Sequence, residues 1–153
     1  MSVLAVVRPD SWNFPLYLHV LGAMILVGGL VAGASALAFA RGDARMLRLG
    51  FWALMLVSFP GWVLMRIGAE WIYSREGWNH VPDNLRPDWL GIGFLIADVG
   101  GLVLVITLII GGIGVRRIQA GKGPGLLKAT LVLSLLLLAA YVVAVWAMAG
   151  KPG

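Results

Sequence analysis

The sequence predicts an all-α fold, a four-transmembrane-helix bundle that forms a single membrane domain over residues 1–153. Hydrophobic residues make up 60% of the chain and charged residues only 12%, about half the charged fraction of an ordinary soluble domain. The apolar residues fall into four runs, each near or above the roughly 20 residues that cross a bilayer core. Basic residues lie between these runs, so the net charge of +5 indicates the lipid bilayer as partner and no nucleic acid.

The four apolar runs set the expected helices in order. The first run opens with Pro15, a residue suited to the first turn of a helix. The second contains Pro60, which predicts a kink there. The loop over 74–88 is interrupted by two prolines, and we expect it to cap one face of the bundle. The expected spans are residues 15–40, 49–73, 89–115 and 126–149.

Two short loops carry most of the positive charge. One holds three arginines against Asp43, and the other holds four basic residues against no acid. Short loops rich in Lys and Arg stay in the cytoplasm, so both termini are expected to be extracytoplasmic. An aromatic belt at the outer interface is expected as well. The basic residues are Arg41, Arg45, Arg48, Arg116, Arg117, Lys122 and Lys128, and the belt residues are Trp12, Tyr17, Trp71, Tyr73, Trp78, Trp89 and Trp146.

Residue usage limits the chemistry that the chain can perform. There are no cysteines and only two histidines, which excludes disulfides and thiolate metal sites and leaves no spaced metal-ligand motif. No paired nucleophile and base is recognisable. We therefore expect no catalytic residues and no protein-held metal. A composition rich in Ala, Gly and Arg favours a bacterial protein, located in the cytoplasmic (inner) membrane as a multi-pass protein.

Five polar residues, one or more from each span, fall in the outer half of the predicted bilayer. Because a lone charge inside a bilayer costs roughly 2.5–3.5 kcal/mol, pairing is expected. We expect an ion pair between Arg66 and Asp98, with Glu70, His19 and Tyr141 hydrogen-bonded around it. This buried polar cluster is the predicted site, and it either orders the bundle or meets a partner.

Small residues follow the helical period in two of the spans. In the first span, glycines recur with His19 at steps of three and four, and in the third span they share a stripe with Asp98. Such stripes let helix backbones approach closely. The glycines expected at helix contacts are Gly22, Gly29, Gly33, Gly101 and Gly112.

The segment "LYLHVLGAMILVGGLVAG" (16–33) carries a histidine early in the helix, followed by glycines. It resembles the first helix of small bacterial four-helix integral membrane proteins of the copper-resistance D-like and HemJ-like kind, including predicted membrane proteins of unknown function. In the haem-associated members, the resemblance implies that His19 is an axial ligand of haem b. The third span holds Asp98, whereas the HemJ-like pattern has a lysine there.

Three functions follow as expectations. The leading one is a non-catalytic binding or accessory module, alone, as a homo-oligomer or beside a partner membrane subunit. The second is a b-type haem redox protein that uses His19 with Met65, His80 or His19 of a second chain. The third is a proton- or ion-coupled transport unit that uses Asp98 and Glu70.

Overall fold

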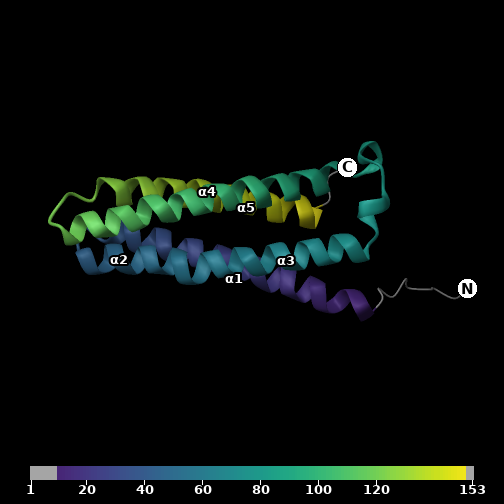
Figure 1. Cartoon of the computed structure of the whole chain (residues 1–153), viewed down its shortest axis with the longest axis horizontal. Helices are drawn as coiled ribbons and strands as arrows, with labels where there is room; N and C mark the ends of the chain where they lie inside the picture. The colour runs from purple at the N-terminus through teal and green to yellow at the C-terminus, as the bar shows by residue number, and fades with distance from the viewer. Residues whose placement is uncertain (1–9, 151–153) are drawn as a thin grey trace, which may run out of the picture.

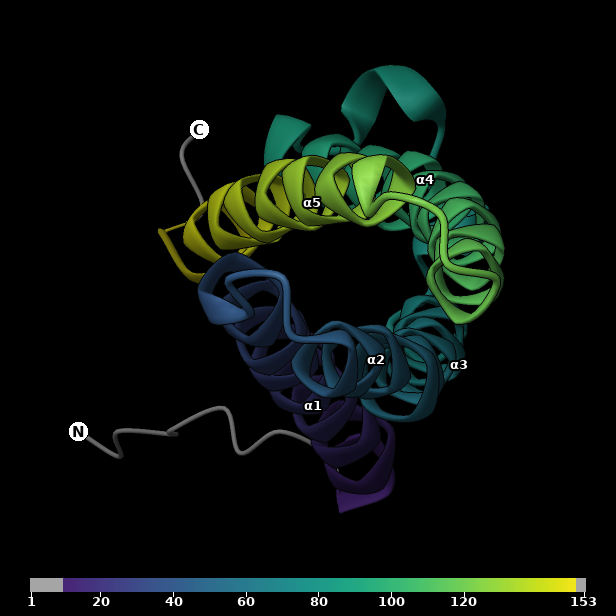
Figure 2. The ribbon, with the colours of Figure 1, turned by 90° about the vertical axis from the view of Figure 1, so that its left-hand side faces the viewer.

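A computed structural model describes residues 10–150, and four long helical segments run antiparallel through them (Figure 1). Each segment is long and apolar enough to cross a membrane, so the all-α, four-helix prediction is confirmed. Viewed along the bundle, α1 and α3 form one side while α4 and α5 form the other (Figure 2). The segments are α1 (Asn13–Phe39), then α2 (Ala44–Ala53), η2 (Leu54–Ser58) and α3 (Phe59–Arg75) as one continuous helix, then α4 (Asp88–Gln119) and α5 (Gly125–Gly150).

The helix boundaries agree with the expected spans within a few residues, except where α2 starts early. Asp43 caps α2, because its side chain accepts a hydrogen bond from the backbone N–H of Arg45 at 2.8 Å. Arg41 and Gly42 both have positive φ (44° and 89°) and form the turn from α1. A good cap thus extends the second helix beyond its apolar run.

A π-helical turn over Leu54–Ser58 joins α2 to α3. Pro60 follows directly, and its missing N–H removes the usual donor to the carbonyl of Leu56. The backbone instead widens by one residue, so that the N–H of Phe59 donates to the carbonyl of Leu54. The structure therefore has a π turn next to Pro60, the residue at which the sequence predicts a kink.

The contact between α1 and α3 is built on glycines. A Cβ atom added at Gly22 would overlap the backbone of Met65, and one added at Gly29 would lie 2.7 Å from the backbone nitrogen of Ser58. Gly61 and Gly68 face α1 in the same way. The two helices pack backbone to backbone, as the glycine stripe predicts, and Gly33 continues the contact against Leu54.

The glycines of α4 have separate roles. A Cβ at Gly101 would overlap the indole of Trp62, which confirms Gly101 as a contact residue. Gly100 accommodates the Tyr141 ring in the same manner. Gly112 is only half-buried, and Phe51 would lie 3.6 Å from an added Cβ, which is an ordinary contact. Gly112 is therefore not a required close-packing position.

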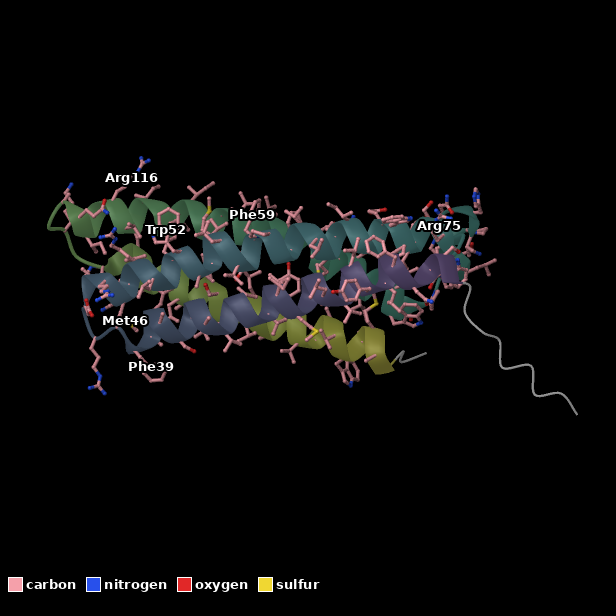
Figure 3. The ribbon with its side chains drawn as sticks, turned by 90° about the horizontal axis from the view of Figure 1, so that it is seen from below. Phe39, Met46, Trp52, Phe59, Arg75 and Arg116 are labelled. Carbon is pink, nitrogen blue, oxygen red and sulfur yellow. The ribbon has the colours of Figure 1, made fainter. Side chains whose placement is uncertain are left out.

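The segment between α3 and α4 lies at the end of the bundle where α1 begins and α5 finishes (Figure 1). It holds two short 3₁₀ helices, η3 (Trp78–His80) and η4 (Asp83–Leu85), and a third, η1 (Asp10–Trp12), precedes α1. Arg75 and Arg116 mark the two opposite ends (Figure 3). Seven basic residues and one acid lie at the Arg116 end, whereas residues 66–98 at the other end carry three arginines and five acids. The two ends therefore have opposite charge.

Candidate functional site

The candidate site centres on Arg66, which α3 directs toward α4. Its Nε donates a hydrogen bond to Oδ1 of Asp98 at 2.8 Å, so the expected Arg66–Asp98 ion pair is present. Its Nη1 lies 2.5 Å from Oε1 of Glu70, one turn along α3, in an ionic contact that is not aligned as a hydrogen bond. One guanidinium is thus shared by two carboxylates from two helices.

Aromatic rings extend this cluster toward the 76–87 segment. The guanidinium carbon of Arg66 lies 5.0 Å from the centre of the Phe94 ring. Phe94 meets Tyr73 edge-to-face at 5.1 Å, and the Arg86 guanidinium lies 5.7 Å from the Tyr73 ring. Asp83 pairs with Arg86 at 2.5 Å. Two aromatic rings in contact thus lie between two guanidinium groups where α3 meets α4, and each ring has a cation over it, a favourable cation–π arrangement.

Trp62 lies between α3 and α4, one helical turn before Arg66 in the chain. Its indole lies against Gly101, and its Nε1–H donates a hydrogen bond to the backbone oxygen of Ala97 at 2.9 Å. Side chains, rather than close backbone packing, therefore join α3 to α4 at this level.

The cluster is not buried, which corrects the expectation of a polar bundle interior. The side chains of Glu70 and Asp98 are 55% and 56% exposed, and that of Arg66 is 22% exposed. The reason is helical phase. Asp98 precedes Gly101 by three residues, which places the two residues about 60° apart around the helix. Because Gly101 faces the interior of the bundle, Asp98 lies at the edge of the buried face of α4. The two carboxylates face outward beside exposed apolar residues such as Ile67 and Leu95.

His19 does not join this cluster. Its Nδ1 lies 3.0 Å from the backbone oxygen of Met65, across the α1–α3 contact. A carbonyl can only accept, so Nδ1 carries the proton and donates it, which leaves the Nε2 lone pair of a neutral ring available. His80, the second histidine, is exposed in η3.

Tyr141 makes no hydrogen bond with the Arg66 cluster. It is 3% exposed, its ring lies against Gly100, and its hydroxyl has no hydrogen-bond partner among the described residues. The other buried hydroxyls of α5 bond within their own helix: Thr130 donates to the carbonyl of Leu126 and Ser134 to that of Thr130. The five predicted residues thus form one ion-paired cluster of three and two separate helix contacts.

A haem does not fit between α1 and α3. At the level of His19 the two helices touch through Gly68, and the imidazole already contacts the backbone of Met65. A macrocycle with axial ligands from His19 and Met65 would need a gap between these helices. Within residues 10–150, no group of three or more His, Cys, Asp or Glu side chains is arranged to hold a metal ion.

An open depression of about 870 Å³ lies beside the Arg66 cluster, toward the segment that joins α3 to α4. Its walls come from the end of α3, the start of α4 and the segment between them. Glu70 lines it on one side and Phe94 on the other, so it continues directly into the cluster. His19 is not among its lining residues.

Sequence reasoning identified the two charged helices but missed Phe94 and Arg86 as parts of the site. Phe94 lies four residues before Asp98 and hence on the same side of α4, which was an available signal. Arg86 follows a proline-rich segment, and nothing in its spacing indicates that it stacks on Tyr73.

Comparison with protein-family models, curated protein sequences and solved structures finds no significant match to this chain.

Proposed function

We propose that this chain is a non-catalytic, multi-pass membrane module that binds a partner at the acidic end of α3 and α4. In this proposal it crosses a bacterial cytoplasmic membrane four times, with both termini and the 76–87 segment on the outer side. Support comes from four membrane-length helices and from the concentration of basic residues at the opposite end, as cytoplasmic loops have.

The position of the cluster along the helices supports a site at the outer interface. Arg66 lies 18 residues from Arg48, and Asp98 lies 18 residues from Arg116, which is about 27 Å of helix in both cases. A hydrocarbon core about 30 Å thick, starting at the basic end, would reach just beyond this level. The shared guanidinium would then lie at the outer boundary of the core.

The single observation that carries the proposal is the outward exposure of Glu70 and Asp98. Two carboxylates, each more than half exposed, share one arginine on a surface that is otherwise apolar. Charged groups in this position are expensive unless water, a headgroup or a partner chain covers them. An ion pair that only held two helices together would be buried between them and would need no other contact. The exposure of these carboxylates therefore favours the binding of a partner.

Site-specific photo-crosslinking in native membranes tests this function. A photoreactive amino acid is placed at Ile67 or Leu95 beside the cluster, and at Val145 on α5 as control. Val145 is exposed and lies 17 residues from Lys128, at nearly the same level. We expect a discrete adduct at 67 and 95, absent at 145 and lost when Glu70→Gln is added. Equal, diffuse adducts at all three positions would contradict a binding site.

A second candidate function, haem binding, is favoured by one observation. The Nδ1–H of His19 donates to a carbonyl, which is the arrangement that orients Nε2 toward a metal. Because the α1–α3 contact is closed, the haem would be held between His19 residues of two chains. A Soret band that shifts on reduction and is lost in His19→Ala would establish it, and a colourless protein after growth with haem would exclude it. Ion-coupled transport through Asp98 and Glu70 stays a prediction.

A further inference from the structure

The depression at the outer end has the size and lining of a ligand site. Its volume of about 870 Å³ falls within the roughly 300–1,000 Å³ of small-molecule sites. Phe94, Leu95 and Leu90 give it an apolar wall on α4, and Tyr73 gives it an aromatic wall on α3. Charged groups lie along the rim.

The lining carries more negative than positive charge. Glu70, Asp83 and Asp88 line it, against one guanidinium, that of Arg86. The ion pair with Asp83 uses the charge of Arg86, and Glu70 must share Arg66 with Asp98. Glu70 and Asp98 carry two negative charges and share one guanidinium, so one negative charge remains uncompensated. The ion pairs of the described residues also give Asp88 no cation. The depression is suited to a cationic group.

The depression also reaches the surface that would face lipid, because one of its lining residues, Leu95, is 64% exposed. It lies 21 residues from Arg116, about 32 Å along the helix, where a core of about 30 Å gives way to headgroups. An occupant with its polar part in the depression would lay its apolar part along the outer face of α4.

A second copy of this chain does not satisfy these charges. Two identical depressions brought together would both present excess carboxylates, and like charges across an interface repel. The group that contacts these carboxylates must therefore be a cation supplied by the occupant.

We infer that the depression binds a phospholipid with a primary-amine headgroup from the outer leaflet. An ammonium offers three N–H donors to the carboxylates. The adjoining phosphate can accept from Nη2 of Arg86, because Nη1 contacts Asp83 and Nε donates to the carbonyl of Val81. A choline headgroup has no N–H donor, and an anionic headgroup would meet excess carboxylates. This inference rests on the proposed function, because Glu70 belongs to both the cluster and the depression.

Native mass spectrometry of the full chain, released from detergent, measures this selectivity directly. Phosphatidylethanolamine, phosphatidylcholine and phosphatidylglycerol with identical acyl chains are added at equal concentration. We expect phosphatidylethanolamine to bind about tenfold more tightly than the other two, as charge-assisted hydrogen bonds allow. In the double variant Glu70→Gln, Asp88→Asn the preference should disappear. Glu76→Gln, a Glu-to-Gln change directly after α3 and outside the lining, should keep it.

The other outcomes are equally decisive. Equal binding of the three lipids to the native chain, or a preference that survives in the double variant, would overturn the inference. If the double variant fails to fold, Leu95→Trp replaces it: the bulk added at this exposed edge should reduce phosphatidylethanolamine binding and leave the other lipids unchanged. A Glu70-dependent crosslink at Ile67 without lipid selectivity would leave the binding function standing and refute only the lipid class.

Discussion

Arg66 is the central residue of the charged cluster, because it pairs with carboxylates from two helices. The side chain of Arg66 is mostly buried, whereas the side chains of Glu70 and Asp98 are more than half exposed. Removing such a group leaves two negative charges without compensation, whereas removing the whole set of charges leaves an apolar surface. Removing Arg66 alone should therefore destabilise the protein more than removing Arg66 together with its carboxylate partners.

Arg66→Met alone should lower the free energy of unfolding by about 1–2 kcal/mol, between the values typical of exposed and buried pairs. The double variant Arg66→Met, Asp98→Leu should lose less, because no carboxylate on α4 is then unpaired. Thermal unfolding in detergent measures both. A double variant less stable than the single one would show that the pair stabilises the bundle by itself.

The hydroxyl of Tyr141 is buried without a partner in the described residues. An unsatisfied buried hydroxyl opposes folding, so Tyr141→Phe should raise the free energy of unfolding by up to about 1 kcal/mol. The same thermal measurement checks this, with Ser134→Ala as control. Ser134 has its bond to Thr130, so its loss should not stabilise. A destabilised Tyr141→Phe protein would mean that the hydroxyl has a partner such as bound water.

At the scale of the elements, α1 and α3 form the closest contact in the molecule. Gly22→Ala places a methyl group against the backbone of Met65, where neither helix has a flexible atom to move. Overpacking of this kind costs about 1–3 kcal/mol. Gly28→Ala, on the open face of the same helix with no atom within 4 Å, should be neutral or slightly stabilising because alanine favours helix. Similar unfolding midpoints for the two variants would contradict the backbone-to-backbone contact.

The helices themselves could be predicted from the sequence because an apolar run of 20 residues has few alternatives. The Arg66–Asp98 pair could be predicted for a similar reason: these are opposite charges inside two apolar runs, at matching distances from the basic ends. The sequence predicts a buried Asp98 because Asp98 lies on the same helical stripe as Gly101. Such a stripe also includes residues at the border of the buried face, however, and only the packing of α4 against its neighbours determines which residues lie at that border.

The partners of His19 and Tyr141 could not be predicted. The glycine stripe of the first span places His19 on a packing face, but the group that each ring meets depends on which helix is its neighbour. α1 packs on α3, so His19 meets the Met65 carbonyl. α5 packs on α4, so Tyr141 meets Gly100. Neither ring makes a hydrogen bond with the Arg66 cluster.

At the scale of the whole molecule, the opposite charge of its two ends predicts its orientation. The chain has no cysteine, so single cysteines can report accessibility without background. Asn84→Cys, exposed in η4, should react with a membrane-impermeant maleimide on intact cells. Gly123→Cys, exposed in the α4–α5 turn, should react only after permeabilisation. The reverse pattern would place the candidate site in the cytoplasm.

The π turn at Leu54–Ser58 also fixes the direction in which Arg66 points. One added residue advances an α-helix by about 100°, so the residue accommodated in that turn sets the angular phase of everything after it. With a purely α-helical connection, α3 would be rotated by that amount relative to α2, and Arg66 would be directed away from Asp98. Formation of the Arg66–Asp98 ion pair therefore depends on the backbone conformation about two helical turns earlier in the chain. Deleting Leu56, an exposed residue of the turn, would remove the accommodated residue, so that a purely α-helical connection would keep Arg66 directed toward Asp98.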